Sequence, residues 1–396
     1  MLRSLYSGIS GLRAEQTMLD VTSNNIANVN TVGFKSSSVQ FEDALSQMVS
    51  AAGLATNAKA GTNPNQVGLG VRVAGVRTNL TEGAQTTTGV NLDAMISGDG
   101  YFVTTQGSQT LYTRNGSFHW DSEGRLATAD GSLVQGWPAV NGAVPTGGKP
   151  STLTLPAGTV APASATTKAV MAGNLPSDAA VGTKLERDIN TYTADGKTQQ
   201  LTVTFTAGTG GAWTYAADDH AGHTDSGSLT TGGATVGAGP TGSGTTATVG
   251  GISVDLSGMS GYAGLSTAAF ADQNGTAAGT LLSVVMGGDG TLSGTFSNGA
   301  TVAIARLAVG TFTNPEGLEK AGNSSLVETL NSGNVRLGTA GQDGYGTVVA
   351  GALEASNVDL SQEFTNLIVA QRGFQANARI ITTSDDILQE LMQLKR

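Results

Sequence analysis

The two ends of the chain constrain its fold most, because both carry apolar residues at helical spacing and the residues between them do not. Spacings of three and four residues alternate from Leu2 to Ile26 and again from Leu360 to Met392. Such a seven-residue repeat predicts helices that pack along one apolar seam. The predicted seam residues are Leu2, Leu5, Ile9, Leu12, Leu19, Ile26, Leu360, Phe364, Leu367, Phe374, Ile381 and Leu388.

The first predicted helix ends in the sequence NNIANVNTVGFK, residues 24–35. Asparagine side chains compete for backbone hydrogen bonds, and glycine admits the left-handed conformation that often follows a helix. We therefore expect an ordered turn with Phe34 as its apolar anchor. Gly8 and Gly11 are expected to weaken the helix, each by about 1 kcal/mol relative to alanine. The turn residues are Asn25, Asn28, Gly33, Phe34 and Lys35.

A second helix is predicted from about Leu360 to the C-terminus. Asp359 or Ser361 can cap it, because a short polar side chain there accepts hydrogen bonds from backbone N–H groups that lack a helical partner. Glu363 places a favourable negative charge in the first turn. Two terminal helices with matching seams are expected to lie side by side, which makes everything between them an insertion.

The inserted residues indicate β-structure divided by glycine turns, since glycine contributes 57 of the 396 residues. Short strands alternate with turn sequences between Gly98 and Trp137. Asn115-Gly116 is the strongest two-residue hairpin signal in the chain. The sequences DSEG (121–124) and ADG (129–131) predict the next two turns. We expect an antiparallel meander in this stretch.

The expected fold class is α+β and mainly β, with terminal coiled-coil-forming helices flanking two inserted antiparallel β domains. Phe41–Leu45 predicts one amphipathic turn, and a long loop after it leads into a strand near Val71–Val76. The Pro/Gly/Thr/Ala-rich stretch Pro145–Pro162 indicates a domain boundary. The predicted parts are an inner helical domain (1–34 and 353–396), a connecting segment (35–88), an inner β domain (89–148 and 281–352) and an outer β domain (149–280).

Residues 207–250 consist almost entirely of glycine, threonine, alanine and serine. Such side chains bury little apolar surface. We therefore predict that this segment is a poorly packed or mobile part of the outer β domain. The strand before it is different, because Leu201, Val203 and Phe205 alternate on one face.

Composition excludes several classes of function. The formal net charge is −10, so the chain has no electrostatic attraction for nucleic acid or an anionic membrane surface. The absence of cysteine excludes disulfides and thiol catalysis. No segment approaches the ~20 apolar residues of a membrane span, so no membrane insertion is expected. The N-terminus lacks the pattern of a cleaved signal peptide.

Candidate catalytic and metal sites fail on their residues. Gly196-Lys197-Thr198 resembles the end of a phosphate-binding loop, but Thr191 stands where that motif needs glycine. His220 and His223 lie in a polar loop without supporting residues, and we interpret them as solvated rather than as metal ligands. We expect no enzymatic activity, cofactor or metal. The carboxylates of that loop are Asp218, Asp219 and Asp225.

The pattern leaves two arrangements of the terminal helices open. A two-helix stalk is marginal by itself. In the first arrangement the ends are frayed in the single chain and become ordered when copies stack in an open polymer. In the second they form an intramolecular coiled-coil stalk. A different class of function is a β-rich surface adhesin that binds glycans through aromatics such as Trp137 and Trp213. The adhesin hypothesis leaves the terminal repeats unexplained.

Three stretches resemble one protein family. Ser23–Lys35 resembles the N-terminal signature of the bacterial flagellar axial proteins, the rod and hook group, and Gly351–Arg396 is similar to their C-terminal signature. Gly98–Trp137 resembles the β domain shared by the hook and distal-rod members. The additional stretch from about Pro150 to Thr280 fits the outer domain of hook subunits. The distal rod protein, typically shorter, is the alternative.

The resemblance implies a hollow helical polymer whose inner tube is made of the terminal helices, with β domains outside. It implies a curved, flexible tube outside the cell, a universal joint that transmits torque from rod to filament. The implied partners are further copies of the chain, the flagellar rod, the hook cap protein, the hook–filament junction protein and the flagellar type III export apparatus. Phe41 and Leu45 are similar to a short element that the export gate recognises in this family; a plain packing turn is the alternative.

Overall fold

The structure, a computed structural model, confirms two terminal helices around a largely β insertion. Helix α1 (Leu2–Ala27) begins the chain and helix α2 (Leu360–Leu394) ends it. Neither of these described helices is both long and apolar enough to cross a membrane. The residues described are 2–53, 60–140, 142–145, 147–155, 158–230 and 246–394.

The chain divides into two compact units. Unit 1 holds both helices and the β-structure nearest to them in sequence, and unit 2 is the central part of the insertion. The division falls at Pro156 and Ala157, within the Pro/Gly-rich stretch. Unit 1 is Met1–Pro156, Val284–Ser293 and Ala303–Arg396, and unit 2 is Ala157–Ser283 and Gly294–Val302.

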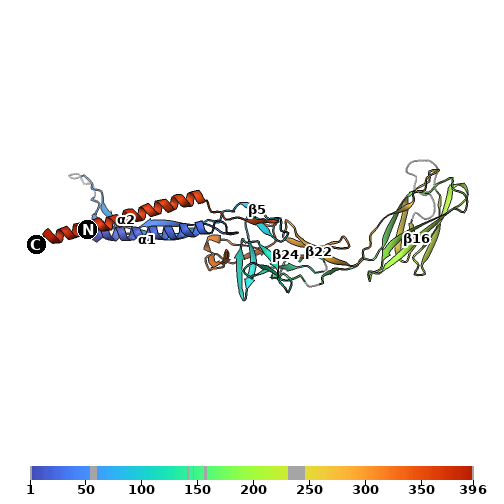
Figure 1. Cartoon of the computed structure of the whole chain (residues 1–396), viewed down its shortest axis with the longest axis horizontal. Helices are drawn as coiled ribbons and strands as arrows, with labels where there is room; N and C mark the ends of the chain where they lie inside the picture. The colour runs from blue at the N-terminus through green and yellow to red at the C-terminus, as the bar shows by residue number, and fades with distance from the viewer. Residues whose placement is uncertain are drawn as a thin grey trace. The chain divides into compact units, whose positions relative to one another are not determined.

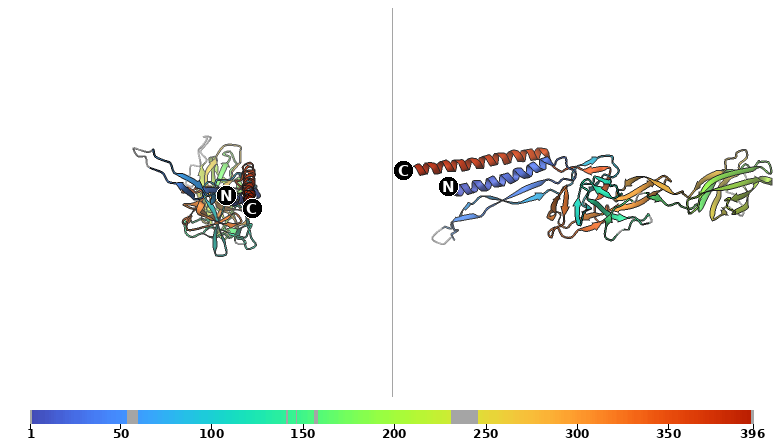
Figure 2. Two further views of the ribbon diagram at one scale, coloured as in Figure 1. Left: turned by 90° about the vertical axis from the view of Figure 1, so that its left-hand side faces the viewer. Right: turned by 60° about the horizontal axis from the view of Figure 1, so that its bottom comes forward.

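Helices α1 and α2 lie side by side in opposite directions, so both chain ends lie at the same end of the pair (Figure 1; Figure 2 shows two further views). Glycines lie at the contact and face larger side chains of the other helix. A Cβ at Gly11 would lie 2.6 Å from Asn377 Nδ2, and one at Gly373 would lie 2.6 Å from Glu15 Oε1. Glycines that weaken the isolated helix therefore allow the two backbones to approach closely.

The predicted apolar seam takes only part in this contact, which corrects the expectation that matching seams join the two helices. Phe364 is 52% exposed, and Ile9, Leu360 and Phe374 are exposed as well. Glycine and alanine allow a closer approach than large side chains, so the large ones remain outside. The side chain of Leu2 lies outside the described residues. The half-buried seam residues are Leu5, Leu12, Leu19, Ile26, Leu367, Ile381 and Leu388.

Asp359 caps α2, as predicted. Its Oδ1 accepts hydrogen bonds from the backbone N–H groups of Ser361 (2.8 Å) and Gln362 (3.3 Å). Ser361, the alternative cap, lies inside the helix. These bonds satisfy donors that the first turn cannot pair internally.

Strands β1 to β4 form two antiparallel pairs where a loop was predicted after Leu45. Strand β1 (Ser37–Asp43) pairs antiparallel with β4 (Val71–Thr78), and β2 (Ser46–Ser50) pairs with β3 (Asn65–Gly68). The predicted strand near Val71 is confirmed, but the amphipathic turn at 41–45 is wrong, because β1 runs to Asp43. Both strands of the β2–β3 pair are exposed, so they lack the apolar alternation that marks a half-buried strand.

The β-structure of unit 1 pairs the chain before unit 2 with the chain after it. Its strands are β5 (Gln85–Thr87), β6 (Ala94–Ser97), β7 (Tyr101–Gln106), β8 (Gln109–Thr113), β9 (Phe118–Trp120), β10 (Leu126–Thr128), β11 (Leu133–Pro138), β12 (Ser151–Thr152), β25 (Val309–Thr311), β26 (Glu319–Gly322), β27 (Ser325–Val327), β28 (Arg336–Gly338), β29 (Thr347–Ala350) and β30 (Ala352–Glu354), with a 3₁₀ turn at η2 (Pro315–Gly317). Pairs β7–β25, β8–β27, β5–β30 and β6–β29 join the two sides. Phe102, Phe118 and Leu126 lie in the core between them.

The predicted hairpin at Asn115-Gly116 is wrong. Strand β8 pairs with β7 and β27, whereas β9 pairs with β10, so the chain crosses over at this dipeptide. Gly116 is needed for close packing, since a Cβ there would lie 1.7 Å from the carbonyl oxygen of Ala94. The turns at 121–124 and 129–131 are confirmed by the β9–β10 and β10–β11 pairs.

Unit 2 contains two four-stranded sheets, ordered β15-β16-β17-β18 and β19-β20-β14-β21, with β14 and β20 parallel and the other neighbours antiparallel. Its strands are β13 (Val160–Ala161), β14 (Lys168–Asn174), β15 (Lys184–Tyr192), β16 (Thr198–Ala207), β17 (Ala212–Asp218), β18 (Thr224–Thr230), β19 (Thr246–Val249), β20 (Ile252–Ser260) and β21 (Ala269–Gln273), with a 3₁₀ turn at η1 (Thr209–Gly211). The chain passes between the units within β22 (Gly279–Met286), β23 (Thr291–Phe296) and β24 (Thr301–Leu307).

The prediction that residues 207–250 pack poorly is wrong for the strands β17, β18 and β19, whereas residues 220–223 between β17 and β18 are exposed. Trp213, Leu229 and Val249 are buried in one core with Phe205. Residues 231–245 of that segment lie outside the described residues. Composition misled the prediction, because Trp213, Tyr215 and Leu229 at alternate positions of β17 and β18 supply the core, while Thr214, Ser226 and Ser228 face outward.

Leu229→Ala tests this packing. Leu229 is 1% exposed, so truncation is expected to destabilise unit 2 by about 2–5 kcal/mol. The matched control Leu265→Ala removes a leucine that is 62% exposed, and its effect is expected within about 0.5 kcal/mol. Calorimetric unfolding of both variants measures the difference, and equal melting of the two would contradict a packed core at β18.

Candidate functional site: the helix pair and its junction

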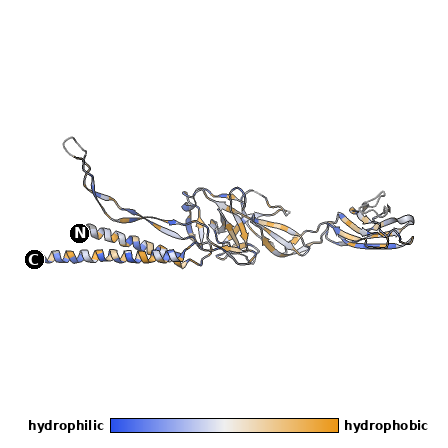
Figure 3. Ribbon diagram, turned by 90° about the horizontal axis from the view of Figure 1, so that it is seen from above, coloured by the Kyte–Doolittle hydropathy of each residue, from blue (hydrophilic) through white to orange (hydrophobic). Residues whose placement is uncertain are grey.

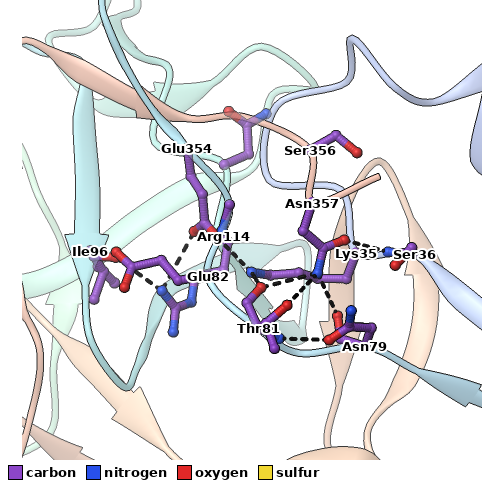
Figure 4. Close-up of polar contacts among 12 residues, drawn as sticks. Lys35, Ser36, Asn79, Thr81, Glu82, Ile96, Arg114, Glu354, Ser356 and Asn357 are labelled. Atoms are coloured by element: carbon purple, nitrogen blue, oxygen red, sulfur yellow. Dashed lines mark hydrogen bonds and ion pairs between the residues drawn. The ribbon is translucent and has the colours of Figure 1, made fainter. Parts of the chain in front are cut away.

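Four segments far apart in sequence meet where the helices join the β-structure (Figure 4). They are the turn after α1, the strand entry at 79–83, the β-structure around Arg114, and the chain from Glu354 into α2. We call Lys35, Arg114, Glu354 and Asn357 the junction cluster. Side-chain contacts within it fix the ends of the β insertion to the roots of both helices.

The carboxylate of Glu354 is the centre of the cluster. It is fully buried and accepts hydrogen bonds from Lys35 Nζ and from the backbone N–H of Gly83 (2.9 Å). Its second oxygen lies 3.5 Å from Arg114 Nη1. Lys35 also donates to the carbonyl oxygen of Thr81 (2.7 Å). One buried anion thus joins cations from two distant segments.

Burial governs the electrostatics of the cluster. It lowers the pKa of Lys35, while the hydrogen bond and charge of Glu354 act to raise it. Arg114 donates to the carbonyl oxygens of Ile96 (3.0 Å) and Gly98 (2.7 Å), and its guanidinium carbon lies 5.3 Å from the centre of the Tyr101 ring. Removing one charge from such a cluster leaves another buried without compensation.

The Asn357 amide ties the same segments together without charge. Its Oδ1 accepts from the backbone N–H of Ser36 (2.8 Å), and its Nδ2 donates to the carbonyl oxygens of Asn79 (2.9 Å) and Thr81 (3.0 Å). The residues after α1 and those before β5 therefore both hydrogen-bond to the chain that leads into α2.

Asn25 joins the two helices directly. It is fully buried. Its Nδ2 donates to the Ser37 carbonyl oxygen (2.7 Å) and to Glu363 Oε1 (3.0 Å), and its Oδ1 accepts from the Ser37 N–H (3.0 Å). Glu363 therefore does more than bias the first turn of α2, because it receives a hydrogen bond from α1.

The remaining predicted turn residues lie in the same region. Asn28 Oδ1 accepts from the hydroxyl of Thr31 (3.0 Å). Gly33 has a φ of 66° and donates its N–H to the Glu354 carbonyl oxygen (2.8 Å). Phe34 is half-buried, and Lys320 Nζ lies 5.5 Å from its ring centre.

Sequence reasoning missed Arg114, Glu354 and Asn357. One signal for Glu354 existed, because it is in phase with the buried Ala352 in β30, and a carboxylate at an inward-facing strand position needs a partner. The identity of that partner was hidden, since Lys35 lies 319 residues away.

The outer surface of the helix pair carries large apolar side chains that the single chain leaves uncovered. Figure 3 shows hydrophobic and hydrophilic residues alternating along α2. Exposed apolar surface on soluble proteins commonly marks an interaction site. Phe41 and Leu45, the possible export element, are also accessible, at 41% and 85% exposed. The exposed large apolar residues of the helices are Tyr6, Ile9, Leu360, Phe364, Ile368, Val369, Phe374, Ile380, Ile387 and Met392.

Two other candidate sites do not form. No group of three or more metal-ligating side chains is present within the described part of the chain. Asp219 accepts from the backbone N–H groups of Ala221 and His223, so this carboxylate orders its own turn. Trp137 and Trp213 are both buried, which contradicts their predicted role as glycan contacts of an adhesin.

Gly33→Ala is expected to destabilise unit 1 by about 2–3 kcal/mol, because alanine is strained at positive φ and its Cβ would lie 2.8 Å from the backbone nitrogen of Asn115. Gly107→Ala is the matched control. Its φ is 63° but nothing lies within 4 Å of the added carbon, so about 1 kcal/mol is expected. Denaturant unfolding compares them, and equal losses would contradict the close approach at Gly33.

Glu354→Gln is expected to cost about 3–5 kcal/mol, because Lys35 and Arg114 stay buried without their anion. Glu316→Gln removes a carboxylate whose ion pair with Arg77 is exposed, and a loss of about 0–1 kcal/mol is expected. Calorimetry of the full chain measures both. A Glu354→Gln variant as stable as Glu316→Gln would show that the cluster does not hold the junction.

Three of the four segments that meet at this junction match known families, and residues 79–83 lie outside the matched ranges. Residues 5–35 match the family described as flagella basal body rod protein, residues 95–170 the flagellar hook protein FlgE/F/G D1 domain, and residues 349–394 the flagellar basal body rod FlgEFG protein C-terminal. Lys35, Arg114 and Glu354 fall in one matched segment each.

Whole-length relatives agree with these matches. The flagellar hook protein FlgE of Borreliella burgdorferi is 36% identical over 441 residues and that of Salmonella typhimurium is 35% identical over 422, with coverage of 100% and 99% of this chain and 100% of each relative. The flagellar basal-body rod protein FlgG of Bacillus subtilis is 33% identical over 397 residues, covering 100% of both chains. The chain therefore belongs to the flagellar hook and rod protein family that includes FlgE and FlgG.

Proposed function

We propose that this chain is the structural subunit of a bacterial flagellar hook, which polymerises into a curved, flexible tube and transmits torque from rod to filament. The observation that carries the proposal is that different residues of the terminal helices face the partner helix and the outside. Small residues join α1 to α2 within the chain, and large apolar residues such as Phe364 and Phe374 stay exposed. Other copies of the same helices are the partners that such a repeated surface fits.

In this proposal the helical domain (1–34 and 353–396) forms the inner tube and carries connectivity between subunits. The connecting segment (35–88), the inner β domain (89–148 and 281–352) and the outer β domain (149–280) surround it. The junction cluster supports this scheme, because a buried charged link is suited to pass force from β-structure to helices. Polar outer surfaces suit sliding between neighbouring subunits during bending, since they favour no single register strongly.

The partners and location follow from the same proposal. The tube lies outside the cell and joins the flagellar rod to the hook–filament junction protein, after assembly under the hook cap protein. Subunits leave through the flagellar type III export apparatus without a cleaved signal peptide, and the accessible Phe41 and Leu45 are the element recognised at the export gate. The role is structural, not enzymatic.

The alternative is a distal rod subunit, which the similarity to Bacillus subtilis FlgG favours. The two functions differ in the shape of the polymer. Electron microscopy of concentrated purified protein, and of detached cell appendages, is expected to show short curved tubes. Straight rods would support the alternative, and the absence of any polymer would contradict both.

Hydrogen exchange tests how assembly orders the terminal helices. Because a two-helix pair with this much exposed apolar surface is marginal, we expect rapid exchange of α1 and α2 in the monomer and strong protection in the polymer. Unit 2, with its own core, is expected to exchange slowly in both. Strong protection of both helices in the monomer would contradict assembly-coupled ordering.

Charge substitution tests the predicted seam at the exposed Phe364 and the half-buried Leu367. Phe364→Asp and Leu367→Asp are each expected to abolish polymer formation, because a carboxylate would be buried between subunits without a partner. Val181→Asp is the control, as Val181 is an exposed apolar residue of unit 2. Pelleting assays at matched concentration, with circular dichroism to verify folding, provide the measurement. Normal tubes from Phe364→Asp would count against the seam.

A further inference from the structure

Glu15, on the contact face of the helix pair, has a buried oxygen without a hydrogen bond from any residue that the structure describes. Glu15 of α1 lies over Gly373 of α2, with its Oε1 2.6 Å from where a Cβ of residue 373 would be. Its Oε2 is buried without a hydrogen bond. A buried carboxylate oxygen without a donor is costly, and such orphans in a native structure need a physical explanation.

The surroundings of Glu15 within the chain do not supply the missing donor. Burial alone raises the pKa of Glu15, with no charged group of the described chain contributing. On the β1–β4 hairpin, which packs on α1, Arg72 is paired with Glu42 and Arg77 with Glu316. The other charged side chains near the pair make no described ion pair with it; they are Arg13 and Asp20 of α1 and Glu363, Arg372, Arg379, Asp385, Asp386 and Glu390 of α2.

Helix α2 carries a matching surplus of donors. Arg372 and Arg379 are exposed, stand seven residues apart and therefore lie on one face of α2. Neither guanidinium has an ion pair or a hydrogen bond to a carboxylate among the described residues. An arginine fork suits a carboxylate better than any other side chain does. The chain thus carries a hydrogen-bond acceptor without a described donor, Glu15 of α1, and two donors without a described carboxylate, Arg372 and Arg379 of α2.

We propose that Glu15 receives the guanidinium of Arg372 or Arg379 from a second copy of this chain, so that the acceptor site of each helix pair is completed only in the polymer. This inference rests on the proposed function and adds a specific contact to it. Gly373 leaves the space that Glu15 occupies. In the proposed contact the arginine of the neighbouring copy enters this space as the helices pack together in the polymer. The contact also helps to set the axial register of successive copies, because it joins one residue of α1 to one face of α2.

The proposal has a definite pH dependence. In the monomer, burial raises the pKa of Glu15, whereas a guanidinium partner in the polymer lowers the pKa of the carboxylate. The contact therefore stabilises the polymer above the monomer pKa and is lost as the pH falls through the polymer pKa. The informative quantity is the difference between wild type and Glu15→Gln, because this variant removes only the Glu15 carboxylate.

The experiment measures the critical concentration for polymerisation of the full chain by pelleting. Glu15→Gln is expected to raise it by about tenfold or more at neutral pH, as for the loss of one charge-assisted hydrogen bond, and the difference is expected to vanish at acidic pH. The control Asp20→Asn removes an exposed carboxylate of the same helix and is expected to polymerise as wild type does. Circular dichroism verifies that each variant is folded.

A double-mutant cycle identifies the donor. Arg372→Gln or Arg379→Gln is expected to raise the critical concentration as Glu15→Gln does, and the double variant is expected to be no worse than either single one. Arg13→Gln is the control arginine, and its effect is expected to add independently to that of Glu15→Gln.

Three results would overturn the inference. The first is a Glu15→Gln variant that polymerises at or below the wild-type concentration, because Glu15 would then be a buried charge that assembly merely tolerates. The second is a double-mutant cycle in which the effect of Glu15→Gln on the critical concentration adds independently to those of both Arg372→Gln and Arg379→Gln, or is coupled to that of Arg13→Gln instead. The third is a wild-type chain that forms no polymer. This result contradicts the proposed function as well as the inference, whereas the first two contradict the inference alone.

Discussion

The buried carboxylate of Glu354 is the interaction on which the arrangement of unit 1 depends. It holds Lys35 from the turn after α1 and Arg114 from the β-structure, while its own chain continues into α2. A buried charge tolerates few arrangements, because an unpaired ion in a low-dielectric interior is strongly unfavourable. Asn25 and Asn357 add hydrogen bonds to the same region. Both helix roots are therefore held to one rigid block of β-structure, a suitable geometry for a subunit that passes torque between its layers.

The helix pair separates two tasks that a coiled coil usually combines. Gly8, Gly11 and Gly373 have no side chain, so α1 and α2 can approach closely at these positions. Several large apolar residues of the repeat, such as Phe364 and Phe374, are thereby left for contacts outside the chain. This separation explains how one amphipathic sequence serves both folding and polymerisation. It also explains why the pair retains an unsatisfied carboxylate at Glu15. In the proposed contact, the unpaired carboxylate destabilises the single chain, and its pairing with another copy stabilises the polymer.

Local sequence signals predicted the elements with strong local causes. The helical repeats, the cap at Asp359 and the turns at 121–124 and 129–131 each depend on residues close together in the chain, and the structure contains all of them. Predictions failed where distant contacts override local preference. Asn115-Gly116 has the composition of a hairpin turn. However, β8 pairs on its second side with β27, which lies more than two hundred residues later in the chain, and not with β9. The exposed pair β2–β3 was not predicted for a related reason, because strands that bury little show no apolar alternation.

The sequence by itself determined that the chain has helical ends, a glycine-turned β insertion, no thiol chemistry and the signatures of the flagellar axial proteins, because these depend on residue type and local spacing. Only the tertiary structure decided which faces of the helices meet, where Trp137 and Trp213 are buried, and that Lys35, Arg114 and Glu354 share one cluster. The physical reason is that side-chain burial and charge pairing are set by neighbours in space. Residues 35 and 354 become neighbours only after the whole insertion between them has folded back on itself.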